Sequence, residues 1–357
     1  MLKVSVITPI FNSESYLIRC LDSVTNQTLQ DIEIICVNDG STDSSLKLLK
    51  EFAVKDKRIK IIDFSENKGV AQARNVGFKN ASGDYIYFMD SDDWLDNDYL
   101  ECMYEAISRS NKPFVHNRSI TKIYETDGIE PVFYARPSTG IQNVLNSPSV
   151  MWSYIFKKSY LDRFNPLFPE MKPRRQTDEY FYHTVVVPQK EVYVIDISNY
   201  YHARRRSSLS FDRHHSYLEY FDLIGVTEKI FEFYKSEDLL SKIPLPLYML
   251  HSHFEKHKFK EKFFAKTKVF FEKIKHEVKA NWSLYDGSNN GSFFLYVIHA
   301  ENHAEYQDLY RKESYFRKLI VRLAACFIMD KQKRRRFREK HYFSVKRDNI
   351  LKISRKR

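Results

Sequence analysis

Residues 4–39 read VSVITPIFNSESYLIRCLDSVTNQTLQDIEIICVND and contain two short apolar runs separated by a helical stretch. Both runs are rich in Val and Ile, which is typical of buried strands, whereas residues 16–24 repeat apolar side chains at helical spacing. Two strands joined through a helix predict a right-handed crossover between parallel strands.

The same alternation continues through residue 89. Two further apolar runs are RIKIIDF at 58–64 and YIYFM at 85–89. A helical pattern at 46–52 precedes the first of them, and a helical pattern at 70–78 lies between the two. This order predicts an α/β fold with a mainly parallel central sheet covered by helices. Ligands bind such sheets beyond the carboxyl ends of the strands. The polar clusters TPIFN, NDGSTD and MDSDD all fall at those ends, so we expect one shared site.

The rest of the chain predicts two more regions. Residues 99–215 combine a helix at 99–110 with shorter strands and proline-containing loops, and residues from 216 onward are mainly helical and rich in Lys, Phe and Tyr. We therefore expect an α/β domain over 1–215, with halves at about 1–98 and 99–215. A helical C-terminal region over 216–357 follows it.

The net charge of +11 is uneven, because residues 1–110 carry −6 and residues 311–357 carry +14. In this tail, apolar side chains from Phe316 to Phe327 recur at helical spacing between basic residues. A packed helix with a solvated basic end, or a nucleic-acid-binding arm, would explain this pattern. We favour a basic amphipathic helix on an anionic membrane surface, with no nucleic acid partner.

The cysteine pattern and the hydropathy of the chain indicate the cellular compartment of the protein. The four cysteines show no C-x-x-C spacing, which fits free thiols in a reducing compartment. The longest apolar candidate, residues 319–329, is about half the length of a bilayer span and contains Arg322. We expect a cytoplasmic protein, peripheral on the inner face of the cell membrane.

The acidic cluster after the fourth predicted strand is a candidate metal site. Asp90 and Asp92 are two residues apart, so strand geometry directs both side chains to a similar side of the sheet edge. Two carboxylates suit Mn²⁺ or Mg²⁺, which binds through one or two carboxylates plus substrate phosphates. The alternative is a solvated loop in which one acid caps the next helix.

Two other clusters also have two interpretations. In VNDGSTDSS, Ser41, Thr42 or Asp43 can cap the following helix, whereas Asp39 at the strand end can accept a hydrogen bond from a nucleotide base. Arg74 lies one turn into the helix that follows Gly69, where its guanidinium can reach a phosphate. A plain surface position is the alternative for Arg74.

These segments, in this order, closely resemble the inverting family 2 glycosyltransferases with the GT-A fold. The resemblance rests on VSVITPIFNSESYLIRCLDSVTNQT, VNDGSTDSS, NKGVAQARNVG and GDYIYFMDSDDWL, and it covers about the first 100 residues. It implies nucleotide recognition by Pro9, Phe11 and Asp39. It further implies donor contacts from Asn67, Arg74, Asp90 and Ser91. It also implies a D-x-D metal motif at Asp90 and Asp92.

Later segments resemble the acceptor side of that family. They read MWSYIFKKSYL, QTDEYF and YYHARRRSSLS. The family pattern Glu-Asp-x-x-Phe places Asp178 as general base, but Thr177 replaces the usual Glu and Glu179 is a rival. An acidic pair that complements a helix dipole is the alternative.

The YYHARRRSSLS segment resembles a family loop with Arg205 and Ser208 in register. The resemblance implies that both residues contact the donor and that Arg205 can clamp its diphosphate. His202 falls where Tyr is more usual. It is either a further metal ligand or a structural histidine.

The expected function is a metal-dependent, inverting transfer of one sugar from a nucleotide sugar, a UDP-sugar, to a hydroxyl of a cell-surface glycan or lipid-linked precursor. No Q-x-x-R-W motif of the processive synthases is present, so single addition is favoured. The rivals are a nucleotidyltransferase and a non-catalytic GT-A-fold binding subunit.

Overall fold

The structure is a computed structural model that describes residues 2–124, 129–133, 138–139, 144, 150–169, 177–197, 199–204, 217–247, 250, 260–285 and 289–311. The chain divides into two compact units, Met1–His215 and Ser216–Arg357. Arg205, Ser208 and the basic tail of 312–357 lie outside the described residues.

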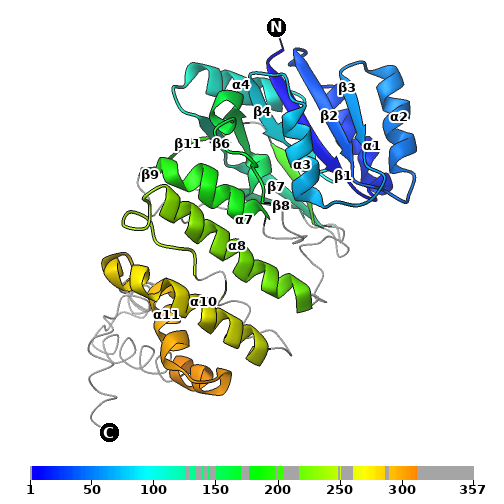
Figure 1. Ribbon diagram of the computed structural model, residues 1–357. Coiled ribbons are helices and arrows are strands. Elements are labelled where there is room, and N and C mark those ends of the chain that lie inside the picture. Colours follow the sequence, from blue (N-terminus) through cyan, green and yellow to red (C-terminus); the bar gives the residue numbers. More distant parts are fainter. Residues whose placement is uncertain are drawn as a thin grey trace, which may run out of the picture. The chain divides into compact units, whose positions relative to one another are not determined.

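The first unit contains an eight-stranded sheet in the order β3-β2-β1-β4-β10-β6-β11-β9 and a four-stranded sheet in the order β5-β12-β7-β8 (Figure 1). The strands are β1 Val4–Ile10, β2 Ile32–Asn38, β3 Ile59–Asp63, β4 Tyr85–Phe88, β5 Trp94–Leu95, β6 Phe114–Asn117, β7 Ser119–Tyr124, β8 Ile129–Phe133, β9 Ser138–Thr139, β10 Tyr154–Lys157, β11 Glu191–Ile195 and β12 Tyr200–Arg204. Strands β1 to β4 are all parallel, and β10 pairs antiparallel with both β4 and β6.

Helices cover both faces of the large sheet. They are α1 Glu14–Thr25, α2 Ser45–Lys55, α3 Val70–Lys79, α4 Tyr99–Arg109, α6 Lys158–Leu161 and α7 Thr177–Phe181, with a 3-10 turn at Met151–Ser153 and π-helical and 3-10 turns over Tyr182–Val186 and Val187–Gln189. Apolar side chains of α1, α2 and α4 form one core with alternate residues of the strands, including Val4, Val6, Ile34 and Cys36. The predicted α/β class is confirmed.

Helix α3 lies on the opposite face, close to β1 and β2 (Figure 1). The approach depends on Gly77, where an added Cβ would be 2.4 Å from Cγ2 of Ile7 and 3.4 Å from Cγ2 of Val37. A side chain at this position would push the helix off the sheet. Gly77 therefore sets the depth at which α3, and with it Arg74, lies against the strand ends.

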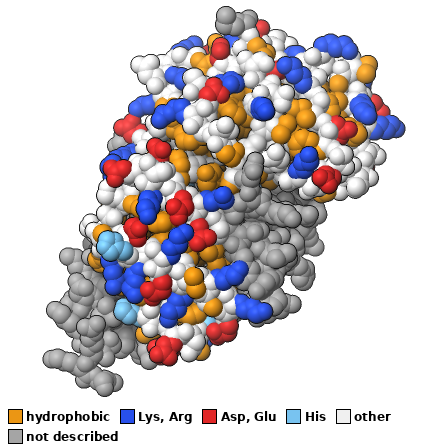
Figure 2. Space-filling model, in the orientation of Figure 1, with side chains coloured by type: hydrophobic (Ala, Val, Ile, Leu, Met, Phe, Trp, Pro, Cys, Tyr) orange, Lys and Arg blue, Asp and Glu red, His pale blue; other side chains and the backbone are white. Residues whose placement is uncertain are grey.

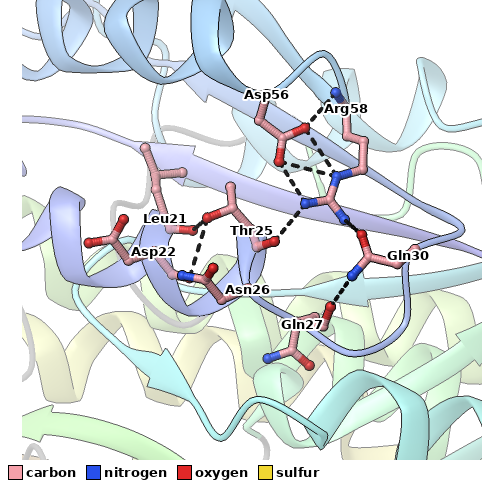
Figure 3. A network of polar contacts seen from close by, with 8 residues as sticks. All are labelled: Leu21, Asp22, Thr25, Asn26, Gln27, Gln30, Asp56 and Arg58. Carbon is pink, nitrogen blue, oxygen red and sulfur yellow. Dashed lines mark hydrogen bonds and ion pairs between the residues drawn. The ribbon is translucent and has the colours of Figure 1, made fainter.

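A polar network holds the C-terminal end of α1, as Figure 3 shows. Arg58 donates from Nη2 to the carbonyl of Thr25 at 2.6 Å and to Asp56 Oδ2 at 2.6 Å. Its Nη1 donates to Gln30 Oε1 at 3.1 Å. A cation at a helix C-terminus satisfies a carbonyl that has no partner within the helix and complements the helix dipole. The network stabilises the helix that begins at the site.

Gln27 connects the same end of α1 to the acidic segment. Its side chain is fully buried. Nε2 donates to the carbonyls of Ser23 at 2.8 Å and Asp96 at 2.7 Å, and Oε1 accepts from the backbone N–H of Leu100 at 2.8 Å. The side-chain amide of Gln27 thus forms hydrogen bonds with backbone groups of three different segments.

The second unit is helical, with α8 Tyr217–Ser236, α10 Lys260–Ala280, a 3-10 turn at Trp282–Leu284 and α11 Asn289–His299. Figure 2 shows basic and acidic side chains interspersed on the described helices. Lys273 pairs with Glu232 at 3.0 Å, and Lys235 lies 3.7 Å from Glu277. Within the described residues, no helix combines the length and apolarity that crossing a bilayer requires.

Candidate active site

The carboxyl ends of β1, β2 and β4 lie at one edge of the sheet, because these strands are parallel and neighbouring. Pro9 is half-buried near the end of β1, and Phe11, which follows the strand, is 45% exposed. The polar clusters predicted to share a site therefore do share an edge.

The loops that follow β1 and β2 exchange hydrogen bonds. Asn12 has a positive φ of 48°, a conformation that Asn tolerates, and its Oδ1 accepts from the N–H of Thr42 at 2.8 Å. The N–H of Glu14 donates to Asp43 Oδ2 at 3.0 Å, and the N–H of Ser44 donates to Glu14 Oε2 at 2.8 Å. Two of the three predicted clusters are therefore fixed to each other.

Of the three capping candidates in the second cluster, Asp43 makes the capping contact. Helix α2 begins at Ser45, its N-cap position is Ser44, and the Ser44 side chain makes no capping hydrogen bond. Asp43 instead accepts from the N–H of Ser45 through Oδ1 at 2.9 Å. Thr42 turns toward the first loop, so the hydroxyl-rich sequence serves the contact between the loops.

Asp39 organises the approach to α3. Its side chain is buried, with Oδ1 accepting from the N–H of Lys68 at 2.7 Å and Oδ2 accepting from the N–H of Gly69 at 2.9 Å. The amide of Asn67, an exposed residue, donates to the carbonyl of Asp39 at 3.2 Å. Gly40, with φ of 67°, allows this contact, because a Cβ there would be 2.5 Å from the carbonyl carbon of Glu66. The structure thus brings the predicted donor residues Asp39 and Asn67 together.

The third cluster forms a turn after β4 in which the N–H of Asp93 donates to the carbonyl of Asp90 at 3.3 Å. The hydroxyl of Ser91 lies 2.8 Å from that of Ser13, which precedes α1. Asp92 is half-buried in this turn. The predicted residues Asp90, Ser91 and Asp92 therefore lie beside the start of α1.

Arg74 is the centre of the site. Its side chain is only 5% exposed, and it donates from Nη2 to Asp90 Oδ1 at 2.9 Å and from Nη1 to Asp178 Oδ1 at 2.7 Å. The alternative of a plain surface position for Arg74 was wrong. Burial opposes the charge of the guanidinium, but Asp178 and Asp90 outweigh it, so the pKa of Arg74 is raised.

The two rival bases have different neighbours. Asp178 is 35% exposed and contacts Arg74, whereas Glu179 Oε2 lies 3.9 Å from Nε2 of His183. His183 is buried, which lowers its pKa to about 3 and keeps the ring neutral. Both acids lie in the first turn of α7, where they also complement the helix dipole. Of the two, Asp178 is the one joined to Asp90 through Arg74.

Negative charge exceeds positive charge in this cluster. Burial first, and then the charges of Asp92 and Asp178, raise the pKa of Asp90 to about 6 against the opposing effect of Arg74. Burial, and then the charges of Asp92 and Asp90, raise the pKa of Asp93 well above its usual range. Hard oxygen donors with too little positive charge around them fit a divalent cation, for which Asp90 and Asp92 could serve as ligands.

The described residues hold no ready-made set of three His, Cys, Asp or Glu side chains for a metal ion. His202, the possible further ligand, lies on β12 with its ring 5.0 Å from that of Trp152 in an edge-to-face arrangement. Mg²⁺ and Mn²⁺ sites commonly use one or two carboxylates and take their other ligands from water and phosphate. The two carboxylates of the turn match that pattern.

The sequence patterns assign no role to Asp93. It is buried, and its carboxylate accepts from the hydroxyl of Tyr200 at 2.5 Å and from the N–H of Ala203 at 2.8 Å. Both partners belong to β12. The signal in the sequence was a third acid where a metal ion needs two, together with the aromatic pair at 200–201.

Comparison with known proteins assigns the chain to a family. The model of the family described as "Glycosyl transferase family 2" matches residues 5–154. GlyG of Streptococcus pneumoniae, named a glycosyltransferase, is 30% identical over 221 residues, which are 58% of this chain and 72% of GlyG. The chain belongs to glycosyltransferase family 2. The membership predicted from the sequence motifs is confirmed.

Two other relatives cover different shares of the chain. The poly(ribitol-phosphate) beta-glucosyltransferase of Bacillus spizizenii is 30% identical over 296 residues, which are 80% of this chain and 44% of that protein. The glycosyltransferase GlyA of S. pneumoniae is 51% identical over 105 residues, which are 29% of this chain and 15% of GlyA. The chain thus spans less than two thirds of either of these proteins.

Solved structures show the fold of this family 2 member. The crystal structure of TarS 1–349 from S. aureus, in complex with UDP-GlcNAc, has a TM-score of 0.66 at 22% identity and covers 88% of this chain and 91% of that chain. The GT-A fold implied by the family resemblance is confirmed.

Proposed function

We propose that this glycosyltransferase moves a single sugar, with inversion, from a UDP-sugar to a hydroxyl of a cell-surface glycan or lipid-linked precursor. The observation that carries the proposal is the pair of contacts from Arg74 to Asp90 and Asp178. They place a carboxylate of the predicted metal motif and the predicted base around one guanidinium, although 104 positions separate Arg74 from Asp178 in the chain.

In this proposal Asp90 and Asp92 hold Mn²⁺ or Mg²⁺. The cation supplies Lewis-acid stabilisation of the charge that develops on the departing diphosphate. Ser91, Asp39 and Asn67 shape the donor side of the site together with Pro9 and Phe11. Arg205, Ser208 and His202 stay predictions as further donor or metal contacts.

Asp178 accepts the proton of the acceptor hydroxyl, and the hydrogen bond from Arg74 orients its carboxylate. An inverting displacement requires a base on the side opposite the leaving group. Asp90 and Asp92 are assigned to the cation, and Glu179 lies next to the buried His183. We therefore assign the role of base to Asp178.

The choice of donor and acceptor draws on relatives. TarS was solved with UDP-GlcNAc and with UDP, which supports a UDP-sugar donor here. The name of the B. spizizenii relative specifies a poly(ribitol-phosphate) acceptor, which supports an acceptor of the cell-surface class. We propose that the basic tail holds the enzyme at an anionic membrane where such acceptors are assembled.

A panel of nucleotide sugars incubated with Mn²⁺ tests the proposal, with release of the nucleoside diphosphate as the readout. We expect release from a UDP-sugar, its loss in excess EDTA, and a similar loss in Asp92→Asn. Undiminished release in EDTA would refute the metal assignment. Incorporation of a nucleoside monophosphate into product would instead identify a nucleotidyltransferase.

A further inference from the structure

The third acid of the 90–93 turn has no place in the mechanism above, yet it is the most deeply buried of the three. Asp93 is 1% exposed, and both of its carboxylate oxygens accept hydrogen bonds from β12, one from Tyr200 and one from Ala203. Its own N–H closes the turn on the carbonyl of Asp90. One residue therefore joins the backbone of the turn to a strand more than 100 positions away.

The strand itself is fixed to the core around Asp93. The ring of Tyr200 stacks on the indole of Trp152 with centroids 4.3 Å apart, and the carbonyl of Trp152 accepts from the hydroxyl of Tyr87 at 2.6 Å. Tyr87 lies on β4, which leads into Asp90. The contacts thus run from the turn through β12 and Trp152 and back to the strand that carries the turn.

The start of β12 has a separate attachment. Asp96 Oδ2 accepts from the N–H of Asn199 at 2.9 Å, and Asp96 Oδ1 accepts from the hydroxyl of Tyr201 at 2.9 Å. Tyr201 also stacks on Trp94 with ring centroids 5.2 Å apart. Removal of the Asp93 carboxylate would therefore free the turn from the strand without detaching the strand from the fold.

We propose that Asp93 is a positioning residue that orients Asp90 and Asp92 for the cation by fixing their turn to β12. The proposal rests on the metal-dependent donor binding proposed above. Hydrogen bonds that orient ligand residues typically change metal affinity about 10- to 100-fold when they are removed. A purely structural role would lower thermal stability and leave the affinity of the folded protein unchanged.

The test compares Asp93→Ala, Asp93→Asn and Tyr200→Phe in the full chain. Alanine removes both contacts to β12. Asparagine keeps one acceptor for Ala203, and phenylalanine removes only the hydroxyl while its ring can still stack on Trp152. Glu33→Gln is the matched control, because Glu33 is also buried and accepts from backbone N–H groups, those of Ser82 and Gly83, at the other end of β2.

Two measurements are made on each variant: the affinity for UDP in the presence of Mn²⁺ by calorimetry, and amide hydrogen exchange in ligand-free protein. We expect Asp93→Ala to weaken Mn²⁺-dependent UDP binding about 10- to 100-fold, with Asp93→Asn and Tyr200→Phe between it and the wild type. Exchange at the N–H of Ala203 in β12 and in the turn at 90–93 should accelerate in the same order. Glu33→Gln should lower the melting temperature without either change.

Two results would overturn the role of Asp93: unchanged UDP affinity in Asp93→Ala, or weaker affinity without faster exchange in β12. Absence of Mn²⁺-dependent UDP binding in the wild type would instead overturn the proposed donor site. The exchange measurement needs no ligand, so it would still decide whether Asp93 fixes the turn to the strand.

Discussion

Arg74 donates to Asp178 over 2.7 Å, and this contact joins the helix after the third strand to the short helix α7. The same guanidinium donates to Asp90. A planar fork with several donors can hold two carboxylates at once, which a single ammonium group does less well. The contact therefore defines the separation between the proposed metal motif and the proposed base.

Arg74→Lys tests that geometry. Lysine keeps the positive charge but lacks the fork, so we expect sugar transfer to fall by about 10-fold or more together with some loss of stability. Arg58→Lys is the matched control, because Arg58 also forks onto a carboxylate, that of Asp56, in the network of Figure 3. The control should lose stability but keep its transfer rate. Equal transfer rates in the two variants would contradict a role of Arg74 in sugar transfer.

Gln27→Leu tests the buried amide that connects three segments. Leucine would leave the carbonyls of Ser23 and Asp96 and the N–H of Leu100 without this partner. Each unsatisfied buried group typically costs about 1–3 kcal/mol, so we expect the free energy of unfolding to fall by at least about 2 kcal/mol. Gln30→Leu, at an exposed position, should cost less. Urea denaturation compares the two, and equal costs would contradict this role of Gln27.

The buried carboxylate of Glu33 should make the free energy of unfolding depend on pH in the acidic range. Burial raises its pKa, but hydrogen bonds from Lys60, Ser5 and Ser82 more than offset burial, so the pKa lies below 4.5 in the folded protein. As the pH falls, Glu33 therefore takes up a proton in the unfolded chain before it does so in the folded protein. The stabilisation from its ionised carboxylate is complete above the unfolded pKa and is lost as the pH falls through the folded pKa.

Urea midpoints measured between about pH 3 and pH 7 should show this loss. The stability difference between wild type and Glu33→Gln should be largest at neutral pH and should shrink below about pH 4.5. A difference that stays constant across this range would show that Glu33 titrates alike in both states.

The tail is tested by charge removal in the full chain. Replacing Lys333, Arg334, Arg335 and Arg336 with Gln removes four positive charges. Each basic residue near an anionic membrane contributes about 1 kcal/mol, so we expect flotation with anionic vesicles to fall sharply and nucleotide release to persist. Unchanged flotation would refute the membrane role, and tight, salt-sensitive DNA binding would favour the nucleic-acid alternative.

Local patterns in the sequence predicted the fold of about the first 110 residues well. The expected strands and helices from 3 to 110 match β1 to β4 and α1 to α4 within a few residues at each end. Their apolar periodicity is local, and the parallel arrangement follows from the crossover rule. The common edge for the three polar clusters follows from the same rule.

The side-chain partners within the site needed the structure. Arg74 contacts Asp178, and Asp93 contacts Tyr200 and Ala203, all across about 100 positions or more. Spacing along one strand or helix carries no information about such contacts. For this reason the sequence left Arg74 between a phosphate ligand and a surface residue, and it left Asp93 without a role.

The proposed reaction depends most on Asp178 as the base, and Asp178→Asn tests it most directly. Asparagine can still accept from Arg74 but cannot take a proton, so UDP affinity with Mn²⁺ should stay near that of the wild type. Transfer to the acceptor should fall about 10²- to 10⁴-fold. Glu179→Gln, one position along α7, should transfer normally. If Asp178→Asn transfers at the wild-type rate while Glu179→Gln is inactive with UDP affinity intact, the assignment is contradicted.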